Sequence, residues 1–252
     1  MRTTIVIPTY NELENLPLLV SALFELPLSD MQILVVDDNS PDGTGLLADE
    51  LAAQNPERIS VMHRPGKLGL GTAYIQGFNQ ALSRGAEAVA QMDVDFSHPP
   101  KKLLELHEAL QSCDVAMGSR YIPGGAVDVR WPLWRKGLSS FGNIYARTIL
   151  RLPIRDATGG FRLWRRDTLL GMPLDRVRSN GYAFQVEMAY LATRLGYSFR
   201  EVPIYFADRK WGESKMSFQI QREAALRVWY MLYTYRDLTN HSPVTSTTQY
   251  LR

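Results

Sequence analysis

The sequence predicts an α/β fold, in which a mostly parallel sheet carries helices on both faces. Along the first half of the chain, short apolar runs rich in β-branched residues alternate with segments of helical periodicity. Turn-forming and acidic residues gather at the points where those runs end. Strands and helices that alternate in this way form a parallel sheet whose two faces are both covered.

Each element of the first half has a local reason. Asn15 can cap the first helix and Pro17 suits its first turn, while the turn-rich stretch 39–43 leads into the second helix. The buried apolar runs predict strands at 5–7, 33–36, 59–62, 88–92 and 115–118. The helical patterns predict helices at 16–26, 44–54 and 71–83, and a fourth from Pro99-Pro100 to about 110.

The second half is less regular. Residues 121–136 are rich in Gly, Pro, Arg and Trp and predict a long loop, of a length that is usually functional. The patterns further predict a turn at 156–161, strands at 162–164 and 198–206, a helix at 184–195, a charged loop at 208–215 and a last helix from 217 to about 235. We therefore expect one domain over 1–237, ending in an amphipathic helix (217–237), and a mobile tail over 238–252.

Composition and charge exclude several classes of function. The 252 residues carry 28 Lys and Arg against 26 Asp and Glu, which argues against a nucleic-acid binder that works by bulk charge. The single cysteine, Cys113, cannot form an internal disulfide or a thiolate zinc site. Because we find neither a membrane-spanning run nor a signal peptide, we expect a cytoplasmic protein, which can still lie on a membrane surface.

Two carboxylates one residue apart, Asp93 and Asp95, follow the fourth predicted strand and open a loop that ends in His98-Pro99-Pro100. Such a pair can address one hard divalent cation, because Mg²⁺ or Mn²⁺ takes few protein ligands and completes its shell with waters and substrate phosphates. Ligands on sheets of this kind bind beyond the carboxyl ends of the strands. We therefore expect a metal–diphosphate site here, with a solvated acidic rim as the alternative.

The loops after the first two strands, 8–12 and 37–44, suit a nucleoside. An aromatic ring such as Tyr10 can stack on a base. A carboxylate such as Glu12 or Asp38 can accept hydrogen bonds from ribose hydroxyls or base N–H groups. Asp42 and Thr44, which lie in the same stretch, are expected to form only turns and caps.

Several motifs together resemble one enzyme family. They are Pro8-Thr9-Tyr10-Asn11-Glu12, the run 37–44, Asp93-Val94-Asp95, Gly69-Leu70-Gly71-Thr72-Ala73-Tyr74, Gly118-Ser119-Arg120-Tyr121, 156–162 and Gly212-Glu213-Ser214-Lys215. This set resembles family 2 glycosyltransferases of GT-A type, whose fold is Rossmann-like, and among them the compact dolichol-phosphate (polyprenyl-phosphate) mannosyltransferases. That resemblance implies inverting transfer of mannose from GDP-mannose to a polyprenyl phosphate on the cytosolic face of a membrane.

Carried over motif by motif, the resemblance assigns roles to the residues of the three loops. Guanosine would be held by Pro8, Tyr10, Glu12, Val36 and Asp38. Asp93 and Val94 would contact the ribose–diphosphate side of the nucleotide sugar, and Asp93 and Asp95 would ligate Mg²⁺ or Mn²⁺. Ser97 stands where some relatives have a further Gln ligand, so either Ser97 or a water would complete the shell. His98 is expected to pack the loop.

The basic residues fit the same interpretation, because a sugar-nucleotide diphosphate and a lipid phosphate repel each other and must be brought together by metal and fixed cations. The resemblance places Arg120 and Lys215 in the catalytic machinery and Arg209 on the nucleotide sugar. Arg135 and Lys136, near Trp131 and Trp134, are candidates together with Arg120 for the acceptor phosphate. For Arg135 and Lys136 the alternative is a solvated basic loop.

No catalytic base is required on this interpretation. A phosphate monoester has a second pKa near 6, so a lipid phosphate is largely a dianion at neutral pH. The Gln-x-x-Arg-Trp motif of saccharide-extending family 2 synthases is missing, because Gln219-Ile220-Gln221-Arg222 continues with Glu223. Asp156, the only carboxylate of the later motif, is expected to order its loop.

The last predicted helix carries Leu226, Trp229, Tyr230 and Tyr233 at helical spacing, near Arg222, Arg227 and Arg236. Core packing and contact with a membrane surface are equally good explanations of this stripe. The resemblance leaves room for a membrane-anchoring subunit, and no nucleic-acid partner is expected. The rival functions are a UDP-sugar transferase of the glucose or aminoarabinose type, an inactive nucleotide-sugar-binding subunit, and a nicotinamide enzyme using Gly69-Leu70-Gly71, whose third glycine is missing.

Overall fold

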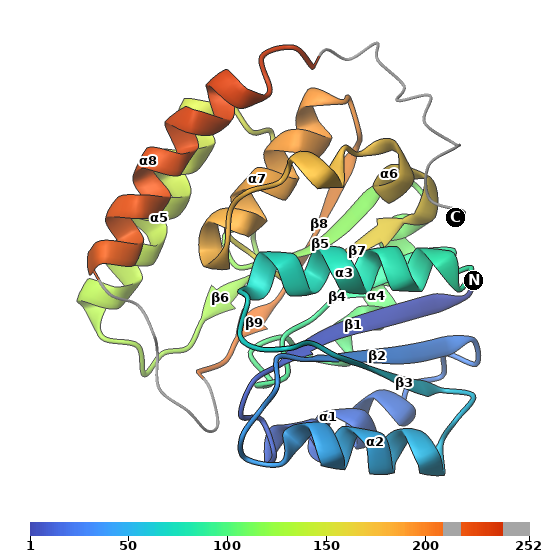
Figure 1. The fold of residues 1–252 in the computed structure, drawn as a ribbon. Helices are drawn as coiled ribbons and strands as arrows, with labels where there is room; N and C mark the ends of the chain where they lie inside the picture. The colour runs from blue at the N-terminus through green and yellow to red at the C-terminus, as the bar shows by residue number, and fades with distance from the viewer. Residues whose placement is uncertain (209–217, 239–252) are drawn as a thin grey trace.

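The computed structural model describes residues 1–208 and 218–238, and its fold is the expected α/β fold (Figure 1). The strands are β1 (Thr3–Thr9), β2 (Met31–Asp37), β3 (Ile59–His63), β4 (Ala88–Gln91), β5 (Val115–Ser119), β6 (Ala126–Val127), β7 (Arg162–Arg165), β8 (Phe199–Pro203) and β9 (Tyr205–Phe206). The helices are α1 (Asn15–Phe24), α2 (Thr44–Gln54), α3 (Leu70–Ser83), α4 (Lys102–Leu110), α5 (Leu133–Leu150), α6 (Arg166–Gly171), α7 (Gly181–Arg194) and α8 (Phe218–Thr234), with a 3₁₀ turn at Leu174–Arg176.

The main sheet has the strand order β3-β2-β1-β4-β7-β5-β8, and β7 is its antiparallel member. β1 pairs in parallel with β2 on one side and with β4 on the other, so that Thr9 lies opposite Asp37 and Val6 opposite Gln91. The carboxyl ends of β1, β2 and β4 therefore open at one edge of the sheet, where the sequence places its acidic loops.

Two apolar layers cover the sheet. On one face, Val6 and Val36 pack with residues of α3, α5, α7 and α8, such as Phe78 and Phe184. On the other face, the alternating strand neighbours of those residues pack with α1, α2 and α4. This period-two alternation between buried faces is what a sheet covered on both sides requires.

The segment 121–136 is not a loop throughout, and this expectation is wrong. β6 begins at Ala126, and α5 begins at Leu133 directly after Pro132, whose fixed backbone suits the entry to a helix. The helix escapes detection because Gly137 and Gly142 interrupt it and its large apolar residues face outward: Leu133 is 84% exposed and Phe141 66%. Only Asn143, Ala146 and Leu150 of α5 are buried.

The expected strand 198–206 is two strands in two sheets. β8 runs parallel to β5 in the main sheet, whereas β9 pairs with β6 in a separate two-stranded sheet. Ile204 joins them: its N–H donates to the Ser119 carbonyl (3.0 Å) and its own carbonyl accepts from the Ala126 N–H (2.9 Å). The chain thus passes from one sheet to the other at the residue after Pro203.

α5 and α8 lie side by side at one flank of the molecule (Figure 1). The end of α8 is fixed to α7 by Tyr235, a buried residue whose hydroxyl donates to Glu187 Oε1 (2.8 Å). Within residues 1–208 and 218–238, no helix combines the length and the apolar character needed to cross a bilayer. Arg209, Lys215 and the expected mobile tail from 239 onward lie outside the described residues.

Candidate active site

Three loops meet beyond the carboxyl ends of β1, β2 and β4, and each contains a residue with positive φ. These residues are Asn11 (60°), Asn39 (57°) and Phe96 (60°). Asparagine tolerates the left-handed region, but an aromatic residue there is strained and persists only where its surroundings enforce it. Strain of this kind collects at functional sites, and Phe96 directly follows Asp95.

The loops after β1 and β2 are tied to each other by hydrogen bonds between their side chains and backbone. The buried Asp37 accepts hydrogen bonds from Thr9 Oγ1 (3.0 Å) and from the N–H and hydroxyl of Ser40 (3.0 and 2.6 Å). Thr44 Oγ1 accepts from the Glu12 N–H (2.9 Å) and donates to Asp42 Oδ1 (2.6 Å). The ordering role expected of Asp42 and Thr44 is therefore the one they have.

Asp38 forms a buried ion pair with Arg64, a residue that the sequence analysis does not single out. Arg64 Nη1 lies 2.5 Å from Asp38 Oδ1, Nη2 donates to Thr72 Oγ1, and the Arg64 side chain is 1% exposed. Burial raises the pKa of Asp38, and the Arg64 charge only partly offsets it. The one available signal was position: Arg64 directly follows β3, the neighbour of β2 in the sheet.

The other residues expected to hold a nucleoside differ in how far their side chains are exposed. Pro8, Tyr10 and Glu12 are half-buried at the sheet edge, with Lys67 Nζ 4.0 Å from the centre of the Tyr10 ring. The Val36 side chain is fully buried and packs in the core on the α3 face, so only its backbone can reach a ligand. Lys67, like Arg64, adds a cation to this edge that sequence reasoning missed.

The Asp93–Ser97 turn presents two carboxylates in different settings. Asp93, whose side chain is 34% exposed, accepts a hydrogen bond from the Tyr74 hydroxyl at Oδ1 (2.9 Å). Asp95 is buried, and its Oδ1 accepts from the Ser97 N–H (3.1 Å) and hydroxyl (2.6 Å). Val94 between them packs in the core. Ser97 therefore holds the Asp95 carboxylate in place.

His98 packs the loop, as expected. Its Nδ1 accepts the Asp93 backbone N–H (3.0 Å), which leaves the ring proton on Nε2, and its ring stacks on Phe161 with centres 5.2 Å apart. Burial lowers the pKa of His98, so the ring is neutral at neutral pH. In the described part of the chain no cluster of three or more His, Cys, Asp or Glu is arranged to hold a metal. A metal at this turn would thus rest on the two aspartates.

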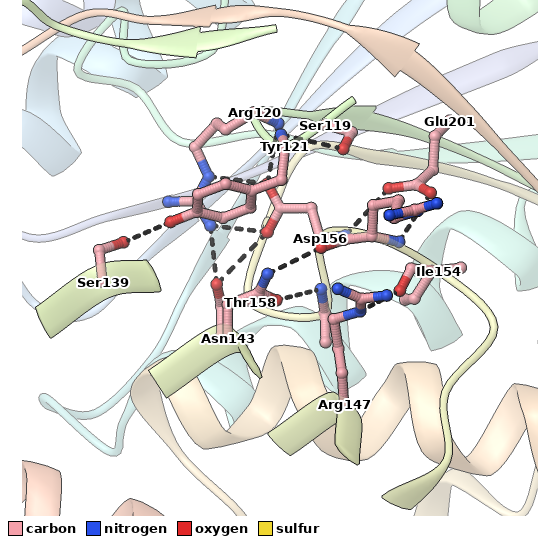
Figure 2. A network of polar contacts seen from close by, with 12 residues as sticks. Ser119, Arg120, Tyr121, Ser139, Asn143, Arg147, Ile154, Asp156, Thr158 and Glu201 are labelled. Atoms are coloured by element: carbon pink, nitrogen blue, oxygen red, sulfur yellow. Dashed lines mark hydrogen bonds and ion pairs between the residues drawn. The ribbon is translucent and has the colours of Figure 1, made fainter. Parts of the chain in front are cut away.

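Arg120, directly after β5, forms a two-point ion pair with Asp156 (Figure 2). Nε and Nη2 each lie 2.7 Å from a different carboxylate oxygen, the Arg120 N–H donates to Oδ2 (3.0 Å), and Nη2 also donates to Thr158 Oγ1 (2.7 Å). Both side chains are buried. Among the described residues Nη1 has no hydrogen-bond partner, so one edge of the guanidinium stays available.

The turn that carries Asp156 is itself fixed from two sides, as Figure 2 shows. The Glu201 carboxylate on β8 accepts the backbone N–H groups of Arg155 (2.7 Å) and Asp156 (2.9 Å). From α5, the Asn143 side chain accepts from the Ala157 N–H (2.9 Å) and donates to the Arg155 carbonyl (2.7 Å). The expected loop-ordering character of Asp156 thus matches its contacts, while Glu201 and Asn143 gave no sequence signal.

Phe206, which the sequence analysis also missed, lies between Arg120, the His98 loop and Trp131. Its ring lies 5.2 Å from the Arg120 guanidinium, 5.9 Å from the His98 ring and 5.8 Å from the Trp131 ring. Arg135 stacks on Trp131 at 3.8 Å and pairs with Asp208 (3.1 Å). Lys136 Nζ donates to the Val129 carbonyl (3.0 Å). Arg120 and Arg135 are thereby connected through two aromatic rings.

Known proteins resemble this chain over most of its length. Residues 4–170 match the family model described as Glycosyl transferase family 2. The chain is 48% identical over 228 residues to the polyprenol monophosphomannose synthase of Mycolicibacterium smegmatis, a match that covers 90% of this chain and 85% of that protein. It is also 48% identical over 229 residues to the undecaprenyl-phosphate mannosyltransferase of Micrococcus luteus, covering 90% and 93% respectively.

Solved structures share the fold at low sequence identity. The mannosyl-3-phosphoglycerate synthase of Rubrobacter xylanophilus gives a TM-score of 0.64 at 16% identity, over 99% of this chain and 80% of that chain. The glucosyl-3-phosphoglycerate synthase of Mycobacterium tuberculosis, solved with Mn²⁺, UDP and phosphoglyceric acid, gives 0.62 at 16% identity, over 92% and 78%. The family model and the two closely similar relatives show that this chain is a glycosyltransferase and belongs to glycosyl transferase family 2, as the resemblance of its motifs implies.

Proposed function

We propose that the protein transfers mannose from GDP-mannose to a polyprenyl phosphate, with inversion at the anomeric carbon. The observation that carries the proposal is the 48% identity, over nine-tenths of the chain, to two proteins named for joining mannose to polyprenyl phosphate. The acidic turn after β4 and Arg120 after β5, which Asp156 holds in place, would supply the two kinds of group that such a transfer needs, one for the leaving diphosphate and one for an incoming phosphate.

The donor would lie across the edge formed by the β1, β2 and β4 loops. Pro8, Tyr10, Glu12 and Asp38 would hold the nucleoside, with the backbone of Val36 beneath it. Arg64 fixes the Asp38 carboxylate, and Lys67, stacked on Tyr10, lies within reach of this edge. Contacts from Asp93, Val94 and Arg209 would complete the nucleotide-sugar site on this proposal.

Mg²⁺ or Mn²⁺ fits the acidic turn by the chemistry of its donors. Hard cations prefer carboxylate oxygens, and Mg²⁺ in particular is usually bound by one or two carboxylates together with waters and substrate phosphates. Asp93 and Asp95 would hold the metal, and Ser97 orients Asp95 through two hydrogen bonds. When bound, the metal would neutralise charge on the leaving diphosphate. The M. tuberculosis neighbour was solved with Mn²⁺ and UDP.

Arg120 would present its Nη1 edge, which has no hydrogen-bond partner among residues 1–208 and 218–238, to the acceptor phosphate. Arg135 and Lys136 would lie on the acceptor side, and Lys215 would be a further catalytic cation. Fixed cations in a desolvated site stabilise developing charge without having to reorganise. The lipid phosphate needs no base, because it is already largely a dianion at neutral pH. Asp156 is unsuited to be one, since it is fully buried and its carboxylate is occupied by Arg120.

A lipid acceptor requires contact with a membrane surface, and α5 and α8 offer one. Trp134 and Phe141 on α5 and Trp229 and Tyr233 on α8 are each more than half exposed. Aromatic side chains of this kind, next to arginines, favour the interface of a bilayer. We therefore propose a peripheral protein on the cytosolic face of a membrane, with or without an anchoring subunit.

A transfer assay tests the proposal. The protein is mixed with Mg²⁺, a polyprenyl phosphate and radiolabelled GDP-mannose, and label extracted into organic solvent is counted. Parallel reactions replace GDP-mannose with radiolabelled UDP-glucose, or the lipid phosphate with the unphosphorylated polyprenol. We expect label in the extract only with GDP-mannose and the phosphorylated lipid. Label that enters the lipid from UDP-glucose instead would establish the alternative function, a UDP-sugar transferase.

A further inference from the structure

Three buried polar side chains form a row of hydrogen bonds from β7 across β4 to α7. Trp164 Nε1 donates to Gln91 Oε1 (3.1 Å), and Gln91 Nε2 donates to Gln185 Oε1 (2.6 Å). Trp164 and Gln91 are fully buried and Gln185 is 4% exposed. The proposed binding of metal, nucleoside and acceptor phosphate uses none of the three. A polar row in a core that could have been apolar therefore calls for a function of its own.

The row has a fixed direction. An indole N–H can only donate, so the oxygen of Gln91 must face Trp164 and its NH₂ group must face Gln185. That NH₂ group can only donate, so the oxygen of Gln185 must face Gln91. The remaining group of Gln185, its NH₂, is thereby fixed as a donor pointing away from the row. Among the described residues none accepts a hydrogen bond from it, and the nitrogen keeps some accessible surface.

The unused NH₂ group lies beside the acidic turn. A Cβ placed on Gly160 would be 3.0 Å from Gln185 Nε2 and 3.4 Å from His98 Cε1, so the bare glycine lets the amide and the imidazole approach the same point of the backbone closely. His98 in turn accepts the Asp93 N–H, and its Nε2 is 3.9 Å from Asp93 Oδ2. The donor of Gln185 is therefore close to the place where the proposed diphosphate and its sugar would meet the metal.

We propose that Gln185 is a specificity-determining residue whose NH₂ group donates a hydrogen bond to a hydroxyl of the transferred hexose. The inference rests on the proposed function and assigns the sugar-contacting part of that same site. A hexose hydroxyl is a neutral acceptor and suits a neutral amide, whereas the diphosphate is served by the metal and the cations of the site. A donor fixed in direction on a largely buried side chain favours a substrate that brings the matching oxygen, because a substrate without that oxygen leaves the donor without its partner in the complex.

The test compares two ligands on the same proteins. GDP-mannose and GDP are titrated, with Mg²⁺ and without lipid, into the wild type, Gln185→Met and Gln185→Asn. Gln185→Asn keeps the amide group, but the side chain is one methylene shorter, so the NH₂ group lies farther from the sugar. Both variants should bind GDP-mannose about tenfold more weakly than the wild type does, the effect of losing one hydrogen bond. Their affinity for GDP should be unchanged, which also reports that they are folded.

A second substitution tests the fixed direction. Gln91 is fully buried and cannot touch a ligand, but the thioether in Gln91→Met cannot donate to Gln185. The Gln185 amide would then no longer be held with its NH₂ group pointing away from residue 91. Gln91→Met should therefore lose affinity for GDP-mannose selectively, while the matched control Gln111→Met, the same change at an exposed site at the end of α4, should lose none.

The outcomes separate this inference from the proposed function. Equal weakening of GDP and GDP-mannose by Gln185→Met and Gln185→Asn would place the contact on the nucleotide part and overturn the hexose assignment. Wild-type affinity of both variants for GDP-mannose would overturn it as well. A wild type that binds neither ligand and transfers no mannose would instead overturn the proposed function, in which case the variants are compared with the sugar nucleotide that the enzyme does use.

Discussion

The Arg120 guanidinium and the Asp156 carboxylate face each other with two parallel contacts of 2.7 Å, both in the protein interior. The pair joins the end of β5 to the turn before β7, two segments 36 residues apart. Such a two-point contact fixes orientation as well as distance. It leaves Arg120 in one geometry before any substrate arrives, which is the arrangement expected of a preorganised cation.

Replacement of Arg120 by lysine should separate charge from geometry. Arg120→Lys keeps a positive charge next to Asp156, whereas Arg120→Ala would leave a buried carboxylate unpaired at a cost of about 3–5 kcal/mol in stability. An ammonium cannot contact Asp156 and a phosphate with separate edges. Full loss of the cation should slow transfer by about 10²-fold, roughly 2.7 kcal/mol. Arg120→Lys should keep part of the stabilisation that the cation provides, so its kcat/KM should fall only about tenfold.

The matched control for this variant is Arg130→Lys, the same change at an exposed arginine that is paired with Asp128. We expect it to leave kcat/KM near the wild-type value. Equal kcat/KM for Arg120→Lys and the wild type, measured under the same lipid and salt conditions, would remove Arg120 from the acceptor site.

The Asp156 carboxyl should make stability depend on acid pH. Burial would raise the pKa of Asp156, but the charge and hydrogen bonds of Arg120 more than offset it and hold that pKa below the usual 3.8. The unfolded chain therefore binds this proton at a higher pH than the folded one, so the stability gained from Asp156 is present above about pH 3.8 and is lost as the pH falls below it.

The measurement is the melting temperature of the wild type and of Asp156→Asn over the range from about pH 6 to about pH 3. The variant should be less stable at pH 6, because an amide pairs less strongly with Arg120. Its melting temperature should then fall less steeply than that of the wild type in the acid range. Parallel curves would contradict the depressed pKa.

The metal assignment predicts a clean loss of activity in Asp95→Asn. The asparagine Oδ1 can still accept both hydrogen bonds from Ser97, so the turn should keep its fold. An amide is nevertheless a poor ligand for a hard cation, so transfer should fall below about a tenth of the wild-type rate. Ser97→Ala, which removes only the hydroxyl contact, should raise the Mg²⁺ concentration needed for half-maximal rate. Turnover of Asp95→Asn near that of the wild type, at an unchanged melting temperature, would refute the role of Asp95.

The membrane assignment predicts that the double variant Trp229→Ser and Tyr233→Ser binds liposomes more weakly than the wild type. Because these rings are 57% and 63% exposed, the melting temperature should change little; burying a large apolar side chain is worth roughly 1.5–3 kcal/mol, and these two are mostly outside the core. Leu46→Ser, at an exposed position on α2, controls for the loss of surface apolar area. Unchanged flotation together with a large drop in melting temperature would mean that the stripe serves packing.

Local sequence signals were enough to predict the acidic edge of the site. Asp93 and Asp95 follow an apolar run that is a strand, and Tyr10 and Asp38 follow two others, so the parallel topology brings their loops together. The alternation of strands and helices along the first half also predicted that both faces of the sheet are covered, and two apolar layers cover them. These features depend on neighbours in the chain, which is why the sequence reveals them.

The contacts that hold the second half of the site depend on residues far apart in the chain. Glu201 accepts the Asp156 N–H from 45 residues away, and Arg64 pairs with Asp38 across the β2–β3 edge of the sheet. α5 was missed for another reason, since its apolar residues face outward, where no packing against the core marks their period. A pattern-based prediction detects a helix by the face it buries, and α5 buries little.

The most direct test of the central claim is the structure of the lipid product. The enzyme is incubated with Mg²⁺, polyprenyl phosphate and GDP-mannose labelled with ¹³C at the anomeric carbon, and the one-bond carbon–hydrogen coupling of the extracted lipid is measured by NMR. Direct attack by the lipid phosphate on the α-linked donor predicts a mannosyl phosphate of β configuration. A product that retains the α configuration would contradict direct displacement, and the absence of a mannosyl phosphate lipid would contradict the proposed function itself.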